Sequence, residues 1–186
     1  MGLGRVLMGD YDTGLKMQQE ACQQLESLNA SDTYGVALIN LAFTKSMGDN
    51  PSGWVTGLDD LNQGLLRMAA ERAFLLKIFT LSIQAQLNLN MGQFRDAHEA
   101  SRQIIKPIEE EHVLFWQEYG LITHVHVLRA LGHDDEADHY LHKAYERVRM
   151  VAGKLQDETL RQSWLENVPW NREIIESAKK RGFDAR

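Results

Sequence analysis

The apolar residues of this chain recur three and four positions apart along most of its length, which is the spacing of amphipathic helices. The clearest stripe consists of Ala137, Leu141, Ala144, Tyr145, Val148 and Val151. The strict alternation of apolar and polar residues that marks a strand does not occur. The 186 residues also include only three prolines. This pattern predicts an all-α chain.

A short motif separates the predicted helices at regular intervals, in residues 8–14, 91–97 and 131–137. In each copy an apolar residue and a glycine are followed, five positions after the glycine, by a small residue. A glycine of this kind ends one helix, so each copy predicts the tight corner of a helical hairpin. The corresponding small residues lie 43, 40 and 40 residues apart, at Gly14, Gly57, Ala97 and Ala137. A period of about 40 residues predicts a solenoid of antiparallel helical hairpins.

The same signals predict helices over about residues 12–28, 33–46, 74–90 and 113–130, besides those that follow the corners. Residues 74–90 are apolar on most faces, so we expect this helix at the centre of the array. Pro107 and the glutamates after it mark the end of the helix that follows Gly92. In the first long helix, the side expected to be buried carries Leu15, Ala21, Cys22 and Leu25.

The two ends of the chain are interpreted differently. Residues 1–8 are too few for the first helix of a hairpin, so the repeat array, assigned to residues 1–156, is expected to begin with a truncated repeat. Either the chain is a fragment of a longer protein, or a partner or second copy covers the open end. Two short helices, over 157–165 and 171–180, are expected to cap the array. Residues 157–186 therefore belong to the same domain.

Residues 47–53 interrupt the repeat. The aromatic residue that follows the corner glycine by two positions elsewhere is here Trp54, six positions after Gly48. Two interpretations remain open for this insertion: a tolerated surface loop, or a loop that contacts a partner.

Composition argues against several classes of function. The formal net charge of −6 disfavours direct nucleic-acid binding, which depends on neutralising phosphates. The single cysteine, Cys22, allows no internal disulfide and is expected to be a small buried hydrophobe rather than a reactive thiol. No apolar run approaches the roughly 18 residues that cross a bilayer, and the N-terminal residues are not a secretion signal. We therefore expect a cytoplasmic protein without membrane contacts.

The sequence offers no convincing catalytic or cofactor motif. A zinc-protease motif would need a second histidine where Arg102 follows His98 and Glu99. No phosphate-binding loop occurs, and no serine or cysteine stands beside an evident base. We therefore expect a non-catalytic protein without cofactors.

One cluster contains metal-ligand residue types: His133, Asp134, Asp135, Glu136, His139 and His142. His139 and His142 share one helix face, but that face is opposite Leu141 and Ala144 and is expected to be solvated. The acidic residues are explained by the helix dipole, which favours negative charge in a first turn. We expect no metal here, with adventitious binding as the alternative.

The corners MGDYDTG, MGQFRDA and LGHDDEA, each beside an apolar helix, resemble tetratricopeptide (TPR) repeats. The period is longer than usual and resembles the arrays found C-terminal to signal-transduction ATPases in bacterial regulators of the maltose-activator and LuxR kind. The tail DETLRQSWLENVPWNREII resembles the segment that closes those arrays. The resemblance covers nearly the whole chain and implies a TPR-like fold, a bacterial origin and a role in signal transduction or transcription regulation.

Arrays of this kind carry a concave groove lined by the first helix of each hairpin. Counting back from the corners places nine residues there: Leu38, Ala42, Lys45, Phe79, Gln86, Asn90, Tyr119, His126 and Arg129. The amides are suited to a peptide backbone, and Lys45 and Arg129 are suited to a carboxylate. The sequence therefore predicts a scaffold that binds a protein or peptide. The alternative is a homodimerisation module that buries its N-terminal end against a second copy and has no separate ligand.

Overall fold

The computed structural model describes residues 1–28, 31–110 and 115–183, and these residues contain eleven helices and no strand. The N-terminal part comprises α1 (Gly2–Leu7), α2 (Tyr11–Ser27), α3 (Ser31–Met47), α4 (Pro51–Arg67) and α5 (Ala70–Leu75). The central helices are α6 (Lys77–Asn90), α7 (Phe94–Glu109) and α8 (Gln117–Ala130). The C-terminal helices are α9 (Asp134–Lys154), α10 (Glu158–Glu166) and α11 (Pro169–Lys180). The prediction of an all-α chain is confirmed.

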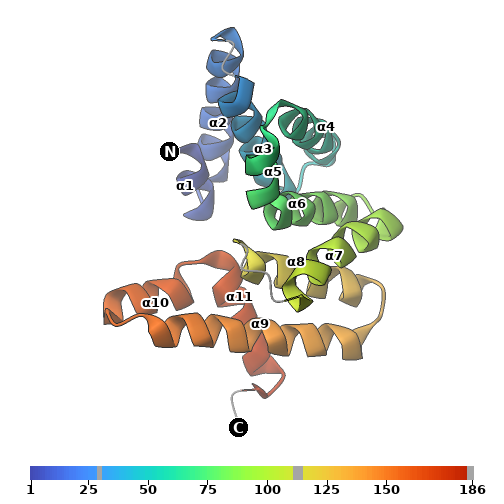
Figure 1. Ribbon diagram of the computed structural model, residues 1–186, viewed down its shortest axis with the longest axis vertical. Helices are drawn as coiled ribbons and strands as arrows, with labels where there is room; N and C mark the ends of the chain where they lie inside the picture. The colour runs from blue at the N-terminus through green and yellow to red at the C-terminus, as the bar shows by residue number, and fades with distance from the viewer. Residues whose placement is uncertain (29–30, 111–114, 184–186) are drawn as a thin grey trace.

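Consecutive helices pack against one another as hairpins, α1 with α2, α3 with α4, α6 with α7 and α8 with α9. Helix α6 also contacts α3, α4 and α8, so it joins the two halves of the molecule (Figure 1). At the other end α10 and α11 pack on α9, and α11 reaches α8 as well. In the described part of the chain, none of these helices combines the length and apolarity needed to span a membrane.

The three predicted corners share one backbone geometry. Gly9, Gly92 and Gly132 have φ angles of 89°, 72° and 76°, which glycine adopts without steric cost. The amide after each glycine donates to the carbonyl five residues earlier over 2.8–2.9 Å, in the pairs Asp10–Arg5, Gln93–Asn88 and His133–Leu128. This is the Schellman closure of a helix. The small residues that follow, Gly14, Ala97 and Ala137, are all buried.

The insertion between α3 and α4 is a short capped turn. The Asn50 side chain accepts the Ser52 amide over 3.1 Å, and Pro51 is the first residue of α4. The Trp54 indole N–H reaches back to the Gly48 carbonyl over 2.7 Å. The insertion is therefore held closed by its own side chains.

Two expectations about the helices of the first half are wrong. Ala21 is exposed, because α2 presents Gly14, Gln18 and Cys22 to its neighbours instead. Residues 74–90 do not form one helix, since α5 ends at Leu75 and α6 begins at Lys77. Phe74 and Leu75 are consequently 60% and 50% exposed, outside the core that encloses α6.

Helix α7 ends at Glu109, within the stretch of Pro107 and the glutamates after it that was expected to mark its end, and Pro107 itself lies inside the helix. The expected start of the next helix at residue 113 lies outside the described residues, and α8 begins at Gln117 after Trp116, whose φ is 67°. The capping helices α10 and α11 begin and end within two residues of the predicted positions.

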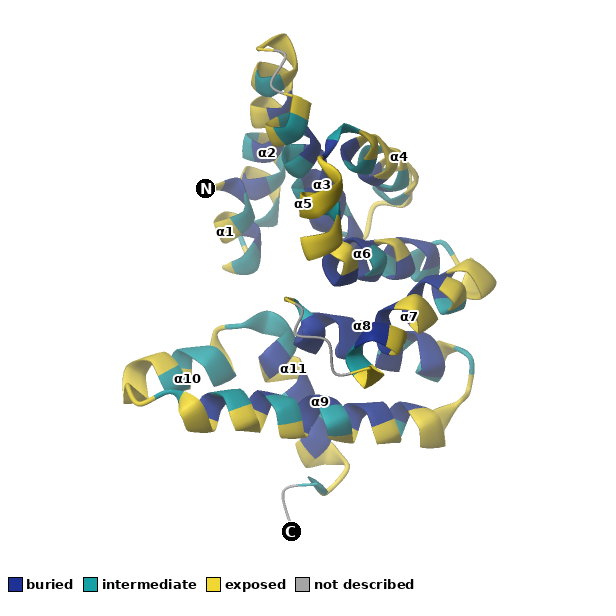
Figure 2. Ribbon diagram, in the orientation of Figure 1, coloured by how far each residue is buried: buried dark blue, intermediate teal, exposed yellow. Residues whose placement is uncertain are grey.

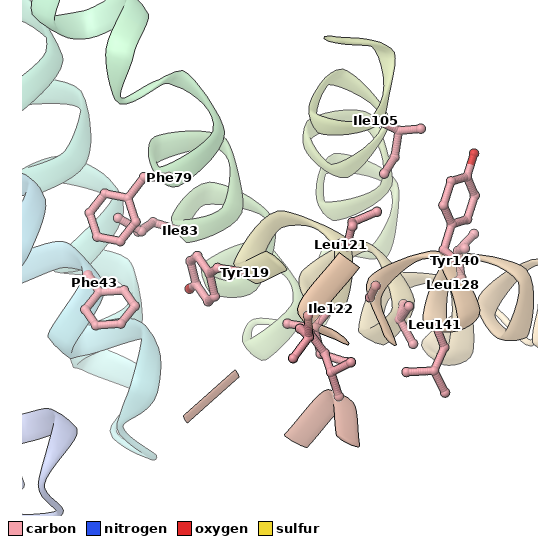
Figure 3. Packing of buried hydrophobic residues seen from close by; sticks show 14 of the residues in the cluster. Phe43, Phe79, Ile83, Ile105, Tyr119, Leu121, Ile122, Leu128, Tyr140 and Leu141 are labelled. Carbon is pink, nitrogen blue, oxygen red and sulfur yellow. The ribbon is translucent and has the colours of Figure 1, made fainter. Parts of the chain in front are cut away.

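One large hydrophobic core runs from α3 through α6 and α8 to α9 and α11. Figure 2 shows the buried positions concentrated on α6, α8 and one face of α9. Aromatic rings form its central part, where Phe43, Phe79 and Tyr119 come from three different helices (Figure 3).

Helices α3 and α4 cross at a pair of glycines. A Cβ atom on Gly64 would lie 2.7 Å from the Gly35 carbonyl oxygen and 2.8 Å from a side-chain carbon of Ile39. We expect Gly64→Ala to lower the free energy of unfolding by about 1–2 kcal/mol, because overpacking exceeds the gain in helix propensity. Urea denaturation followed by circular dichroism measures this.

The matched control for Gly64 is Gly153, a helical glycine of α9 at which an added Cβ atom would have no neighbour within 4 Å. Gly153→Ala is expected to raise stability by up to about 1 kcal/mol, because only the helix propensity changes. Equal effects of the two substitutions would contradict the close crossing of α3 and α4.

Candidate functional site

A cavity of about 400 Å³ lies where the C-terminal ends of α3 and α6 approach α8 and the start of α11. Its walls come from four parts of the chain: Phe43, Ser46, Met47, Gly48, Asp49, Trp54, Gln86, Asn90, Tyr119, Ile122, Thr123, His126, Pro169, Trp170 and Glu173. We call it the α3–α11 pocket. It lies within the size range of ligand sites in proteins.

The inner wall of the α3–α11 pocket is aromatic. Tyr119 packs edge-on against Phe43 with ring centroids 5.6 Å apart, and Trp170 from α11 lies 5.4 Å from Tyr119. Burial raises the pKa of the Tyr119 hydroxyl, although hydrogen bonds with the side chains of Ser46 and Thr123 act in the opposite direction. Tyr119 therefore stays a neutral phenol and contributes an apolar surface.

An ordered chain of amides forms a second wall. The Gln86 side-chain nitrogen donates to Asn90 Oδ1 over 2.7 Å, and Asn90 Nδ2 donates to the Ser46 carbonyl over 2.8 Å. This chain ties the end of α6 to the end of α3. Within the described chain, Gln86 Oε1 accepts no hydrogen bond, so it is available to a ligand's N–H group.

The third wall carries the charged groups. His126 Nε2 lies 2.6 Å from Glu173 Oε1, which joins α8 to α11. Burial alone would raise the pKa of Glu173, but the hydrogen bond with His126 and the charges of His126 and Arg129 bring it below its ordinary value. Glu173 is therefore an anion at neutral pH. Asp49 lies at the exposed rim. The described lining contains no lysine or arginine.

Four of the nine residues expected in the groove line this pocket: Gln86, Asn90, Tyr119 and His126. Phe79 does not, because it is 2% exposed and stacks on Trp116 at 4.5 Å beneath the pocket. Tyr119 also belongs to the core, at 9% exposed, but it does line the pocket. The expectation that Phe79 is an exposed groove position is wrong, since it belongs to the core. The same holds for Leu38 and Ala42, which are buried.

The two cations expected to hold a carboxylate are already paired. Lys45 Nζ lies 2.5 Å from Asp60 on α4, and Arg129 Nη2 lies 3.7 Å from Asp138 on α9. Neither lines the pocket. The groove expected from the sequence did not include Asp49, Trp54, Trp170 or Glu173. Asp49 lies in the insertion for which a partner-contacting role was left open, and Trp54 follows it. Trp170 and Glu173 follow Pro169 in the tail motif that carried the family resemblance.

The remaining candidate groups are the histidine cluster and Cys22. In residues 1–28, 31–110 and 115–183, no three His, Cys, Asp or Glu side chains are placed to hold a metal ion. His133 approaches Glu136 and His142 approaches Glu146, whereas His139 packs on Tyr140. Cys22 is buried as expected, and burial raises its pKa to about 11, which leaves the thiol protonated and unreactive.

Comparison of the chain with protein-family models, with curated proteins and with solved structures found no match to any of them.

Proposed function

We propose that this chain is a TPR-like helical-hairpin scaffold that binds an extended segment of a partner protein in the α3–α11 pocket. The three equivalent corners, the stacked hairpins and the two capping helices support this assignment of the fold. The observation that carries the binding proposal is the pocket itself. It joins aromatic walls to a free amide acceptor and two carboxylates.

The chemistry of the lining suggests what enters the pocket. Trp54 and Trp170 offer aromatic surface, and the described lining contains the carboxylates of Asp49 and Glu173 but no lysine or arginine. Glu173 is held by His126 and is also close enough to Arg129 to feel its charge, so Asp49 is the less compensated of the two. Aromatic faces and carboxylates together favour a lysine or arginine side chain with its apolar stem. The ligand in this proposal is therefore a basic peptide segment, rather than the carboxylate that Lys45 and Arg129 would suit.

The setting of this activity follows from the family resemblance. We propose a non-catalytic regulatory segment of a cytoplasmic bacterial signalling or transcription-regulating protein. No cofactor enters the proposal. Residues 47–53 then act as a partner-contacting loop, because Asp49 and Trp54 lie at the pocket.

A random peptide library selected on the immobilised chain tests the proposal, with calorimetry of the selected peptides. We expect the peptides to share a lysine or arginine beside an apolar residue. Asp49→Asn should weaken their binding about threefold to fivefold, the size of one exposed charge interaction. Asp59→Asn is the control, because Asp59 is exposed on α4 outside the lining and should leave the affinity unchanged.

Two outcomes would contradict the proposal: selection of acidic peptides, or equal affinities of the Asp49→Asn and Asp59→Asn variants. Sedimentation equilibrium distinguishes binding of a separate partner from the alternative, self-association of the chain. A dimer whose dissociation constant rises with Asp49→Asn would show that the pocket is occupied by a second copy of the chain.

A further inference from the structure

A cleft of about 870 Å³ lies in the C-terminal cap. It lies between the end of α9, α10 and α11, which Figure 1 shows side by side, and its lining shares no residue with that of the α3–α11 pocket. We call it the cap cleft. Its position and lining are independent of the proposed peptide binding.

The walls of the cap cleft are fixed by hydrogen bonds between the three helices. The Trp164 indole N–H donates to the Val148 carbonyl over 3.2 Å and ties α10 to α9. The Asn171 amide donates to the Trp164 carbonyl over 3.0 Å and ties α11 to α10. These hydrogen bonds hold the three helices in place around the cleft.

The cleft lies in the basic part of an acidic protein. The whole chain has 20 lysines and arginines against 26 aspartates and glutamates, but from Lys143 to Phe183 the counts are nine and six. Four of these cations line the cleft: Arg149, Arg161, Arg172 and Lys179. Glu166 and Glu176 are the two carboxylates in the lining.

Three of the four cations are not neutralised. Arg161 donates to the Leu155 carbonyl and to the Glu158 carboxylate, so its charge is already paired. Arg149 instead donates to the Tyr145 hydroxyl over 3.1 Å, and Arg172 reaches only the Glu166 carbonyl at 3.5 Å. Among the described residues, no carboxylate lies within 4 Å of the cationic groups of Arg149, Arg172 or Lys179.

The lining also contains apolar surface, chiefly Leu165 on α10 and Ile175 on α11, both half-buried. Arginine forks match the oxygens of phosphates and carboxylates. Three unpaired cations correspond best to an anion with more than one charge, and a phosphate monoester carries about −1.5 to −2 at neutral pH. We propose that the cap cleft binds a small organic phosphate, with the phosphoryl group on Arg149, Arg172 and Lys179 and the organic body on Leu165 and Ile175.

Calorimetric titration of the full chain with phenyl phosphate tests this site, with phenyl sulfate and inorganic phosphate as comparison ligands. Phenyl phosphate should bind at one site and more tightly than either. Phenyl sulfate has the same shape but a single charge, and inorganic phosphate lacks the organic body. Absence of saturable binding, or equal affinity for either comparison ligand, would overturn the proposal.

Variants assign the site to these residues. Arg172→Gln should weaken phenyl phosphate binding about tenfold, the effect of one charge-assisted hydrogen bond. Arg95→Gln, at an exposed arginine of α7 outside the cleft, should have no effect. Glu176→Gln should strengthen binding, because it removes a like charge, and a gain cannot arise from unfolding. An affinity unchanged in both Arg172→Gln and Glu176→Gln would overturn the proposal.

Discussion

Replacing Phe79 with alanine is expected to lower the free energy of unfolding by about 3–5 kcal/mol, the cost of deleting a fully buried phenyl ring. Phe79 is 2% exposed. Its ring centroid lies 5.2 Å from that of Phe43 on α3 and 4.5 Å from that of Trp116. The deletion therefore removes contacts that join α6 to both halves of the molecule. Urea denaturation followed by tryptophan fluorescence and by circular dichroism measures the loss.

The matched control is Phe94, the first residue of α7, which is 46% exposed. Phe94→Ala should cost much less, because its ring keeps extensive contact with water in the folded state. This comparison also distinguishes the two roles considered for Phe79. If Phe79 lay in an open groove, its substitution would weaken ligand binding with little change in stability. A Phe79→Ala variant as stable as the Phe94→Ala variant would therefore contradict the place of Phe79 in the core.

The corners were predictable from the sequence because their cause is local. A glycine with positive φ and the hydrogen bond from the following amide are set by a few adjacent residues, as at Gly92 and Gly132. Another local signal, a proline at the first helical position, places the start of the capping helix α11 at Pro169. The break at Leu76 was missed because no glycine or proline marks it.

The candidate pocket was only partly predictable because its walls come from distant parts of the chain. Helical spacing placed Gln86 and His126 on the inner side, and both line the pocket. It gave no indication that Trp170, 51 residues after Tyr119, covers that ring. Lys45 is not available to a ligand because it pairs with Asp60 in the next helix. A repeat pattern does not specify a pairing of this kind.

Acid is expected to destabilise the chain through His124, which is 2% exposed in α8. The Ser101 hydroxyl donates its proton to the His98 carbonyl over 3.0 Å. The Ser101 oxygen also lies 3.0 Å from His124 Nδ1, and because its own proton is already donated, it accepts the N–H of the ring there. The ring also packs edge-on against Tyr140 at 4.7 Å. This arrangement fits a neutral imidazole.

Burial lowers the pKa of His124 to about 4, the charges of His98 and Arg102 act in the same direction, and Glu109 opposes them. The unfolded chain has a histidine pKa of about 6.5 and binds the proton first as the pH falls. The stabilisation is therefore complete above about pH 6.5 and is lost progressively down to about pH 4. We expect the free energy of unfolding to fall by about 1 kcal/mol at pH 5.5 and about 2–3 kcal/mol at pH 4.5 from this group alone.

Urea denaturation of the wild type and of His124→Gln between pH 7.5 and 4.5 isolates this contribution, because carboxylates titrate in both proteins and their effects cancel in the difference. The amide of glutamine is able to donate to Ser101 but carries no charge at any of these pH values. The variant is expected to be less stable at pH 7.5 and to lose less stability on acidification. His139→Gln removes an exposed histidine and should keep the wild-type dependence. A His124→Gln variant with the wild-type pH dependence would show that His124 is not the buried neutral group that makes this protein sensitive to acid.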